Sequence, residues 1–530
     1  MNPSAFLPRW MIPYGIATIL VTALLVQLVA GIPELSTTYD ETTHLPSGYS
    51  YLETGDFGLN AQHPPLIKLL AAGPRYFLKR DTDFSNTGLG QPNPNEWAIG
   101  YQFLYGNDTE SLLLWGRVSV ALLAVLLSVY VFAWASKSGG AVGGLLALAL
   151  CAFSPTIIGH GRLVTFDVPL ACFMTATLYH LWRYCEDRTP SHLLLTGTAL
   201  GLALASKYSG LMLVPIVVLL LGLELFRGDQ GRENINRKPI FLFLTSSAVI
   251  FAIALVIIQA SYFFSSDLLI YWKGLARIQQ DHFDNYPYYL MGQFREGGWW
   301  YYHPLAFLLK TPATTLLLAI LAFLLSKRFP PAKGTDDLFL LVPILFIFAV
   351  TSAFADNLGV RYLIPVLPLM FVYISRLARW MKNSRAAKAT VGILLTWYTA
   401  NSVAIFPDQL SYFNEFTGGA SSGHLYLDDS NIDWGQDLVK LKRYMDENGV
   451  DSVRLHYGNN VSPQTYGINA QAVTNDEWMH DPAPGLYAFG TNILVRGRYY
   501  SQYHGLNTDW LSRFEPVARV GYSLWIFEIE

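Results

Sequence analysis

Long runs without a charged side chain alternate with short polar segments along most of the chain. Arg9 to Glu34 and Lys238 to Asp267 contain no charged residue between their ends. Further runs of this kind lie at 117–137, 137–162, 188–207, 337–356 and 388–408, and shorter ones follow positions 167, 207, 310 and 361. A bilayer core of about 30 Å needs roughly 20 apolar helical residues. The pattern therefore predicts about eleven transmembrane helices, the first of which is retained rather than cleaved as a signal peptide.

The pattern changes after Pro407. Residues 407–530 are polar and rich in Asp, Asn, Gly and Tyr. Gln436 to Asn448 predicts a helix that Gly449 ends. Short strands are expected at Ser452–Tyr457, Leu486–Phe489 and Ser523–Glu528. We therefore expect an α-helical polytopic membrane domain over 1–406 and a small α/β domain over 407–530.

Basic residues gather in alternate loops, and short loops rich in Lys and Arg face the cytoplasm. These residues are Arg9, Lys137, Arg183, Arg188, Arg227, Arg232, Arg237, Lys238, Lys327, Arg328, Lys333, Arg376, Arg379, Lys382, Arg385 and Lys388. The rule predicts a cytoplasmic N-terminus. It also puts a long first loop over 34–110, and everything after 407, on the outer face, which in a bacterial inner membrane is the periplasmic face.

Composition agrees with a membrane protein. Apolar residues make up 52% of the 530 residues and charged residues only 14%, whereas a soluble domain carries about 25% charged residues. The 36 Lys and Arg against 39 Asp and Glu give a net charge of −3, which indicates no nucleic-acid partner. Cys151, Cys172 and Cys185 lie in or beside apolar runs, so we interpret them as small buried hydrophobic residues.

Ionisable side chains stand at the ends of helices that face the predicted outer side. Such groups are costly near a membrane and are therefore functional candidates. They are Asp40, Glu41, His63, Lys68, Arg162, Asp167, Lys207 and Arg361. A carboxylate can deprotonate an incoming hydroxyl or amine, while Arg and Lys can hold a phosphate and stabilise it as it leaves. This combination suits sugar transfer from a lipid-phosphate sugar.

Each of these residues also has a structural interpretation. Arg162 and Asp167 could form an ion pair that fixes a helix end, and Lys207 and Arg361 could anchor to lipid headgroups. The Asp40-Glu41 pair could begin an interfacial helix, and His63 could be a hydrogen-bonded loop histidine. Their joint placement on one side favours the functional interpretation.

Several motifs follow one another in a fixed order along the membrane part. They are Asp40-Glu41, His63-Pro64-Pro65-Leu66-Ile67-Lys68, Gly161 to Asp167, Gly201 to Gly210, and Arg361 to Pro368. In this order they resemble the membrane-embedded C-type glycosyltransferases. The chain is most similar to bacterial relatives of protein O-mannosyltransferases and of lipid A aminoarabinose transferase. The resemblance implies a helix bundle whose first outer loop carries interfacial helices over a cavity.

The resemblance also implies roles for individual residues. The first acidic residue after the first helix is the usual base of the family, which is Asp40 here. Glu41 is the neighbour that would orient or hydrogen-bond, and Asp167 completes the catalytic set. Arg361, Lys207 and Arg162 would bind the donor phosphate. The implied donor is a sugar on a polyprenyl phosphate, undecaprenyl phosphate in a bacterium, and one displacement would invert the sugar carbon. His63, Lys68, Tyr208 and His303 are further candidates for contacts with the substrate.

A departure from the family concerns metal binding. Aminoarabinose transferases carry a Glu-Lys pair before the proline, whereas this chain has Gln62-His63-Pro64. One histidine with loose spacing predicts no metal site. The wider superfamily includes oligosaccharyl transferases that use a divalent cation, which leaves open Mg²⁺ or Mn²⁺ between Asp40 and Asp167, or Zn²⁺ at His63.

Two further outer segments carry chemistry. The four aromatics Trp299 to Tyr302, just before His303, suit an interfacial belt, and they could instead stack on a sugar. Asp428, Asp429, Asp433 and Asp437 suit the acidic start of a helix, with acceptor or Ca²⁺ binding as the alternative. This second segment, with Leu410 to Glu415, is similar to segments of bacterial members of the same group.

Three other functions compete with sugar transfer. An oligosaccharide ligase would use a lipid pyrophosphate donor. A transporter or flippase predicts ionisable residues at mid-membrane, broken helices and paired halves, whereas the charges here cluster at one face. A non-catalytic scaffold would leave those charges without a role. The sugar and the acceptor stay unassigned.

Overall fold

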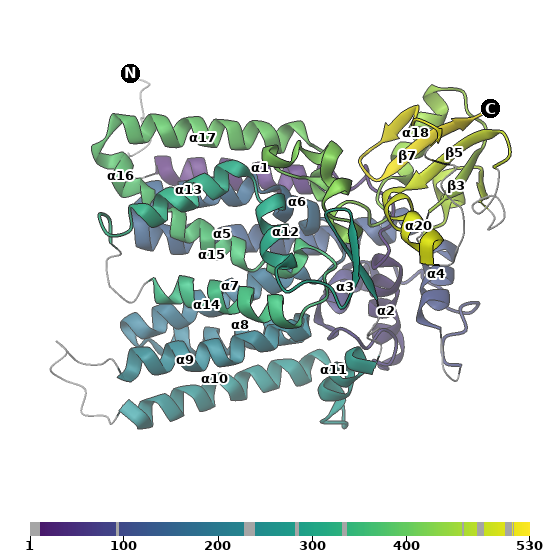
Figure 1. Ribbon diagram of the computed structural model, residues 1–530. Helices are drawn as coiled ribbons and strands as arrows, with labels where there is room; N and C mark the ends of the chain where they lie inside the picture. Colours follow the sequence, from purple (N-terminus) through teal and green to yellow (C-terminus); the bar gives the residue numbers. More distant parts are fainter. Residues whose placement is uncertain are drawn as a thin grey trace, which may run out of the picture.

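A helix bundle carries a small mixed sheet at one of its ends (Figure 1). The computed structural model describes residues 11–91, 95–226, 239–280, 286–330, 337–457, 460–473, 482–503, 511 and 513–530. The basic residues Arg9, Arg227, Arg232, Arg237, Lys238 and Lys333 lie outside the described residues.

Every apolar run predicted to span a membrane is helical. A single long element, α5, covers the two runs that share Lys137, and the helix breaks at Gly140, whose φ is 71°. The corresponding helices are α1 (Ile12–Ala30), α5 (Thr109–Ala152), α7 (Asp167–Asp187), α8 (Pro190–Ser206), α9 (Leu213–Phe226), α10 (Pro239–Ser261), α13 (Ala313–Leu324), α14 (Leu338–Phe354), α15 (Val366–Ile374) and α17 (Arg385–Ala404).

Within the described ranges, four segments are long and apolar enough to cross a membrane, namely α1, α5, the stretch Tyr208–Leu225 that includes α9, and α10. A fifth is α12 (Tyr302–Lys310) taken together with α13, two helices that meet at 108°. The membrane character is therefore confirmed, while the number of about eleven spans stays a prediction.

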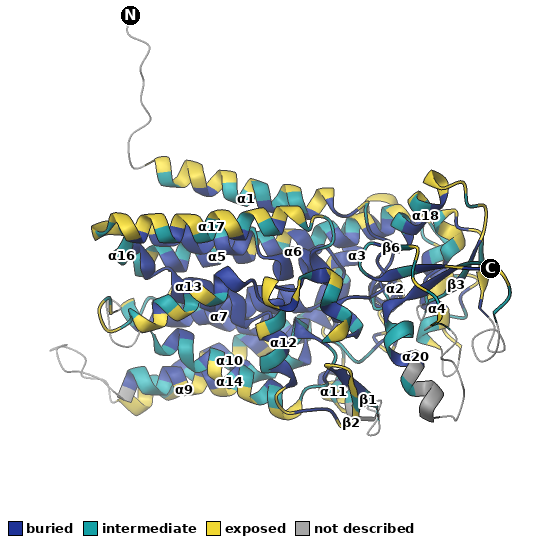
Figure 2. Cartoon of the chain, turned by 45° about the horizontal axis from the view of Figure 1, so that its top comes forward, coloured by how far each residue is buried: buried dark blue, intermediate teal, exposed yellow. Residues whose placement is uncertain are grey.

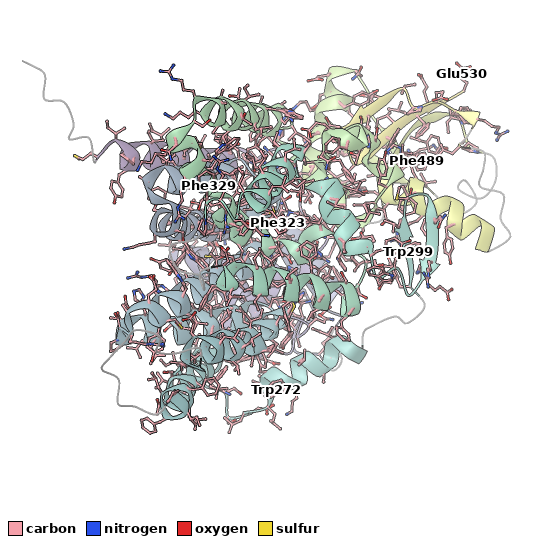
Figure 3. All side chains as sticks on the ribbon, turned by 60° about the vertical axis from the view of Figure 1, so that its left-hand side comes forward. Trp272, Trp299, Phe323, Phe329, Phe489 and Glu530 are labelled. Atoms are coloured by element: carbon pink, nitrogen blue, oxygen red, sulfur yellow. The ribbon has the colours of Figure 1, made fainter. Side chains whose placement is uncertain are left out.

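The outside of the bundle is apolar. Helices α1 and α17 leave many side chains exposed (Figure 2). Phe323 on α13 and Trp272 on α11 (Ile270–Gln280) are more than half exposed (Figure 3). Exposed apolar helix surface is what contact with lipid requires.

Small residues let the helices approach closely. Gly197 and Gly201 on α8 face α10, and a Cβ at Gly201 would lie 2.6 Å from the Cβ of Ile257. The backbones of α8 and α10 therefore pack closer than larger side chains would permit, a common arrangement between membrane helices. At the centre of the bundle, α5 packs against α1, α7 and α15.

The first long loop folds into three helices over the end of the bundle that carries the sheet (Figure 1). An exposed apolar face, typical of the interfacial helices that the resemblance implies for this loop, occurs on α3, which begins after Pro65 and exposes Leu70, Phe77 and Leu78. Asp40 occupies the residue before α2, but its side chain makes no capping hydrogen bond. The three helices are α2 (Glu41–Thr54), α3 (Leu66–Lys79) and α4 (Glu96–Gly106).

The C-terminal part contains the helix and the three strands that its sequence predicts. Gly449, with φ of 66°, follows the end of the helix as expected. The sheet has the order β4-β3-β5-β7-β6, in which β3 pairs parallel with β4 and β5, and β7 pairs antiparallel with β5 and β6. The elements are α18 (Leu438–Glu447), β3 (Val453–His456), β4 (Ala470–Ala472), β5 (Gly485–Gly490), α20 (Thr491–Tyr503), β6 (Ala518–Val520) and β7 (Leu524–Ile529).

Short elements complete the chain. Between α10 and α12 lie α11 and a hairpin of β1 and β2. The remaining elements are α6 (Pro155–Gly161), η1 (Tyr208–Met212), β1 (Pro287–Leu290), β2 (Gln293–Glu296), η2 (Val360–Leu363), α16 (Leu377–Asn383), η3 (Gln409–Ser411), η4 (Glu415–Thr417), η5 (Ala420–Leu425), η6 (Asp429–Asn431) and η7 (Pro463–Tyr466).

A buried ion pair fastens the first outer loop to the bundle. Glu41 lies 2.6 Å from Arg117 of α5, and both side chains are almost completely buried. Glu41 also accepts hydrogen bonds from the backbone of Thr38 and of Val164, each at 2.9 Å. Although burial alone would raise it, the pKa of Glu41 is lowered because Arg117 and these donors favour the charged form.

We expect Glu41→Gln to destabilise the protein by about 3–5 kcal/mol, because it leaves the Arg117 charge buried without a counter-charge. Thermal unfolding in detergent measures this loss. Because its pKa is lowered in the folded state, Glu41 stabilises the fold above its ordinary pKa of 4.5, and the contribution disappears as the pH falls below that value.

The matched control is Glu34→Gln, which removes an exposed pair with Arg443 at 2.9 Å and should cost less than about 1 kcal/mol. Equal melting temperatures for the two variants would contradict the structural importance of the Glu41–Arg117 pair.

Candidate active site

Two ion pairs from four distant parts of the chain meet beside one tyrosine. Asp40 lies 3.0 Å from Arg361, and Asp167 lies 2.6 Å from Lys207. The Lys207 ammonium is 4.8 Å from the centre of the Tyr362 ring, and the Arg361 guanidinium is 5.5 Å from it. The structure therefore brings together four of the predicted site residues.

The two pairs differ in exposure. The side chains of Asp40 and Arg361 are 21% and 16% exposed, whereas those of Asp167 and Lys207 are 4% and 10% exposed. A molecule approaching from outside can therefore reach the Asp40 carboxylate, while Asp167 is closed off behind it.

The turn that carries Asp40 is fixed by its neighbour. Glu41 accepts hydrogen bonds from the hydroxyl of Thr38 at 3.0 Å and from Arg117 at 2.6 and 2.9 Å. Its side chain is completely buried, so it cannot touch a substrate. These contacts suit the orienting part that the resemblance implies for Glu41 next to Asp40, which stays a prediction.

Neutral aromatic side chains form the wall next to these charges. The rings of His44 and His63 each lie 4.3 Å from Phe166, and a ring nitrogen of His44 is 3.0 Å from the carbonyl of Val164. Burial lowers the pKa of His44 to about 4 and lowers that of His63 well below its usual value. Both histidines are therefore neutral at pH 7.

Lys68 holds the loop that carries His63. Its ammonium donates to the carbonyls of His63 at 3.1 Å and of Asn60, and to the hydroxyl of Tyr51 at 3.2 Å. The side chain is completely buried, so its observed contacts are those that hold this loop, and its contact with a substrate stays a prediction. Burial lowers the pKa of Lys68 to about 7.

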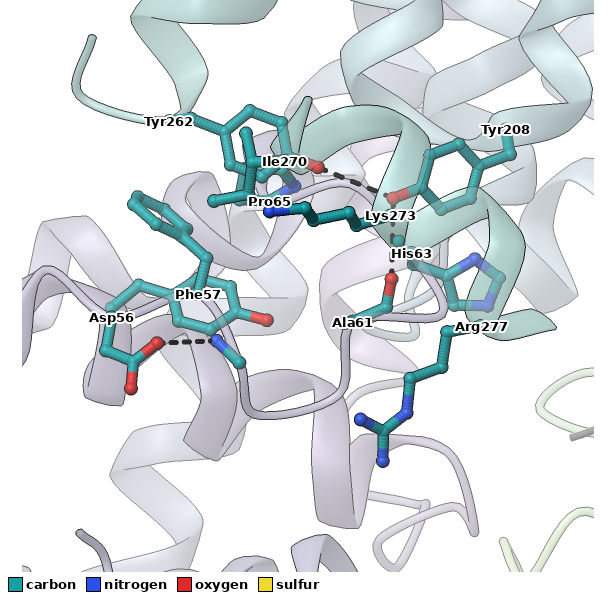
Figure 4. A pocket seen from close by; sticks show the side chains of 13 residues that line it. Asp56, Phe57, Ala61, His63, Pro65, Tyr208, Tyr262, Ile270, Lys273 and Arg277 are labelled. Atoms are coloured by element: carbon teal, nitrogen blue, oxygen red, sulfur yellow. Dashed lines mark hydrogen bonds between the residues drawn. The ribbon is translucent and has the colours of Figure 1, made fainter. Parts of the chain in front are cut away.

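A pocket of about 290 Å³ opens next to His63 (Figure 4). The Tyr208 hydroxyl is 3.4 Å from the carbonyl of Ala61 and 3.5 Å from the hydroxyl of Tyr262. The pocket also contains two basic side chains of α11 that the sequence analysis did not single out. Its lining consists of Tyr51, Asp56, Phe57, Gly58, Ala61, His63, Pro65, Tyr208, Tyr262, Ile270, Lys273, Gly274 and Arg277.

Two further predicted residues are buried next to other partners. Arg162 is completely buried and donates to the side chain of Gln409 at 2.9 Å and to the carbonyl of Pro407. It therefore ties the chain after α17 to the bundle, and its contact with a phosphate stays a prediction. His303 is buried beside Tyr362, with ring centres 5.6 Å apart, and its Nε2 is 3.3 Å from the carbonyl of Ala355.

The aromatic run before His303 is divided between two environments. Trp300 is 74% exposed, in keeping with an interfacial belt, while Tyr302 is buried and accepts a hydrogen bond from Asn431 at 3.1 Å.

The members of the acidic segment have different partners. Asp428 pairs with Arg496 at 2.8 Å, and Asp437 lies directly before α18 and pairs with Lys440 at 2.6 Å.

Sequence reasoning did not place Trp434 in the site. The Arg361 guanidinium lies 4.8 Å from the Trp434 ring. The backbone amide of Tyr39 donates to the carbonyl of Trp434 at 2.8 Å. The sequence did show that residues 429–437 are similar to segments in other bacterial chains. That similarity does not tell where the segment lies relative to the site.

The residues present do not fit the metal that the sequence left open. Asp40 and Asp167 are each paired with a cation. Among the side chains that the structure describes, no three of His, Cys, Asp or Glu gather into a metal-binding group. We derive no step through a metal ion.

Comparison with known proteins gives the fold. Residues 104–259 match the family model for dolichyl-phosphate-mannose-protein mannosyltransferase. Protein mannosyltransferase 1 of Saccharomyces cerevisiae is 31% identical over 168 residues, which are 30% of this chain and 18% of the yeast protein. The chain thus spans less than a fifth of that relative.

Two solved structures share the architecture over most of the chain. The crystal structure of ArnT from Cupriavidus metallidurans bound to undecaprenyl phosphate has a TM-score of 0.51 at 13% identity, covering 97% of this chain and 98% of ArnT. The oligosaccharyltransferase AglB from Archaeoglobus fulgidus has a TM-score of 0.51 at 10% identity, covering 93% of this chain and 71% of AglB. The predicted resemblance to the C-type membrane glycosyltransferases is confirmed.

The buried ammonium of Lys68 gives a pH-dependent prediction. Between its folded pKa of about 7 and its ordinary value of 10.5, the unfolded chain binds more protons, so stability rises with pH. Lys68→Met should remove up to about 1.4 kcal/mol per pH unit of that rise, measured as the melting temperature from pH 7 to 10.

The control is Lys442→Met, which alters a partly exposed lysine paired with Asp446. A Lys68→Met variant whose melting temperature follows the same pH curve as the unsubstituted protein would refute the effect of burial.

Proposed function

We propose that the chain is a membrane glycosyltransferase that moves one sugar from a polyprenyl-phosphate carrier to an acceptor at the outer face of the membrane. The observation that carries the proposal is the Asp40–Arg361 pair, a reachable carboxylate 3.0 Å from a reachable guanidinium. The match of residues 104–259 to the mannosyltransferase family model supports it.

Asp40 would act as the general base. It takes the proton from an acceptor hydroxyl or amine while the acceptor atom forms its bond to the anomeric carbon of the sugar. At the same time the bond from that carbon to the phosphate oxygen breaks, and the carrier leaves as a polyprenyl phosphate. A single displacement of this kind inverts the configuration at the sugar carbon.

Arg361 and Lys207 would stabilise the leaving phosphate, on which negative charge grows in the transition state. An arginine has several donors in a planar fork, so Arg361 can contact a phosphate while it still holds Asp40. Asp167 keeps Lys207 directed towards Tyr362, at the closed end of the site.

The pocket beside His63 would receive the carrier. Lys273, which pairs with Asp267 at 2.6 Å, and Arg277 are its two cations, Asp56 is its acidic residue, and Phe57 and Ile270 provide apolar walls. The neighbouring residue Trp272 is 53% exposed, as contact with lipid requires. Two proteins of the same fold bind isoprenoid phosphates, undecaprenyl phosphate in ArnT and a dolichol-phosphate in AglB, which supports a polyprenyl phosphate here.

Asp40→Asn tests the reaction. It keeps the shape of the side chain but removes the base, so the turnover number should fall by roughly 100-fold or more, in the range of general-base catalysis. Transfer is measured with the purified protein in detergent, a polyprenyl-phosphate sugar as donor and a cell-envelope extract as the source of acceptors. The products are identified by mass spectrometry.

Asp446→Asn, which alters an exposed carboxylate of α18, should transfer sugar at the normal rate. Near-normal turnover by Asp40→Asn would remove Asp40 from the mechanism.

The carrier site is tested by the double substitution Lys273→Glu and Arg277→Glu. Reversal of both charges should weaken binding of undecaprenyl phosphate by about tenfold or more, because each side chain contributes an attractive charge to the phosphate. Binding is measured by titrating the lipid in detergent micelles, with Lys442→Glu as the control.

Unchanged lipid affinity in the double variant would place the phosphate elsewhere. Stronger competition by a pyrophosphate-linked lipid than by the monophosphate would favour an oligosaccharide ligase over a single-sugar transferase.

A further inference from the structure

A short segment of the C-terminal part reaches into the site from the sheet side. Residues 428–438 hold the chain just before α2 through backbone contacts. The amide of Ser36 donates to the carbonyl of Gln436 at 2.9 Å, and the hydroxyl of Ser36 donates to the carbonyl of Gly435 at 2.6 Å. The amide of Leu438 returns a hydrogen bond to that hydroxyl at 3.0 Å.

The same segment holds the chain just before Arg361. The hydroxyl of Ser430 donates to the carbonyl of Leu358 at 2.6 Å, and the amide of Val360 donates to the side chain of Asn431 at 3.1 Å. Gly359 fits this contact because a Cβ there would lie 2.6 Å from the Ser430 hydroxyl. One segment therefore fixes the backbone next to both members of the Asp40–Arg361 pair.

Within this segment, Trp434 contacts Arg361 directly and also contacts the residue that precedes Asp40. Its carbonyl accepts a hydrogen bond at 2.8 Å from Tyr39, the residue directly before Asp40. Its ring lies 4.8 Å from the Arg361 guanidinium, a distance at which a cation and an aromatic face attract each other. The Trp434 side chain is only 4% exposed, so it has little freedom to move away.

We propose that Trp434 is a positioning residue for the Asp40–Arg361 pair, so that the C-terminal domain completes the active site. This inference rests on the proposed function, because it assigns Trp434 a part in sugar transfer. Its physical basis is that displacement of reacting groups by about 1 Å can cost about 100-fold in rate. The hydrogen bond between Tyr39 and the Trp434 carbonyl fixes the backbone next to Asp40. The Trp434 ring restricts the side-chain conformations that Arg361 can adopt.

The alternative is that Trp434 only packs the domain onto the bundle. The chain offers a matched control for this, because Arg519 lies 4.2 Å from the ring of Trp525 in the C-terminal sheet. Trp525→Ala therefore removes a similar contact between an arginine and a tryptophan from a part of the domain that the mechanism does not use. Trp434→Phe keeps an aromatic face over Arg361 and tests rescue.

Transfer from a polyprenyl-phosphate sugar is measured for Trp434→Ala, Trp434→Phe and Trp525→Ala. For Trp434→Ala we expect kcat to fall about tenfold or more, with the donor KM changed less than about threefold, because the carrier pocket lies at other residues. Trp434→Phe should recover most of kcat, and Trp525→Ala should keep it. Normal kcat in Trp434→Ala, or no recovery in Trp434→Phe, would overturn the inference.

Amide hydrogen exchange tests whether Trp434 orders the Asp40 turn, and it does not depend on an assay of sugar transfer. Trp434→Ala keeps the carbonyl that the Tyr39 amide binds, but it removes the ring, which packs in one cluster with Leu35 and Tyr39. The amides of residues 36–41 should therefore exchange about tenfold faster in Trp434→Ala, whereas in Trp525→Ala they should keep their normal rate. Unchanged exchange at 36–41 in Trp434→Ala would overturn the inference. A wild-type protein that transfers no sugar would count against the proposed function, and the exchange result would still decide whether Trp434 orders the Asp40 turn.

Discussion

The buried Glu41–Arg117 pair is the interaction on which the arrangement of the site depends. Because both groups are buried, loss of either one would leave the other as an unpaired charge inside the protein. The pair therefore fixes the turn around Glu41 against α5. Asp40, the residue directly before Glu41, lies 3.0 Å from Arg361. A charge that has no access to substrate thus determines where the accessible carboxylate lies.

Exposure separates residues that share the same signature in sequence. Asp40, Lys68 and Arg162 are all ionisable residues near helix ends on one side of the bundle. Asp40 remains partly exposed, while Lys68 and Arg162 are completely buried and satisfy backbone carbonyls. The proposed chemistry is therefore assigned to Asp40, while Lys68 and Arg162 hold nearby segments of the chain.

The sequence was a good guide where one physical rule dominates and a poor guide where partners come from distant segments. Helix positions followed from the apolar length that a bilayer demands, and Asp40, Asp167, Lys207 and Arg361 followed from the cost of charge at a membrane. The partners of Lys68 and Arg162 could not be read in this way, since carbonyls leave no trace in sequence. The position of Trp434 beside the site could not be predicted for a related reason. The segment that contains Trp434 is held by partners far away in the sequence, as the hydrogen bond from Ser36 to Gly435, 399 residues apart, illustrates.

Charge balance explains why the proposed site needs the pocket beside it. Asp40 with Arg361 and Asp167 with Lys207 sum to zero, and His44 and His63 are neutral because burial lowers the pKa of each. A phosphate that entered this set alone would make it negative, which disfavours both binding and the growth of charge on the leaving group. The adjoining pocket adds donors from Lys273 and Arg277, although Lys273 also pairs with Asp267 at 2.6 Å and Asp56 is part of the lining. In the proposed reaction, the two ion pairs therefore orient the reacting groups, while the pocket would supply further donors for the phosphate of the carrier.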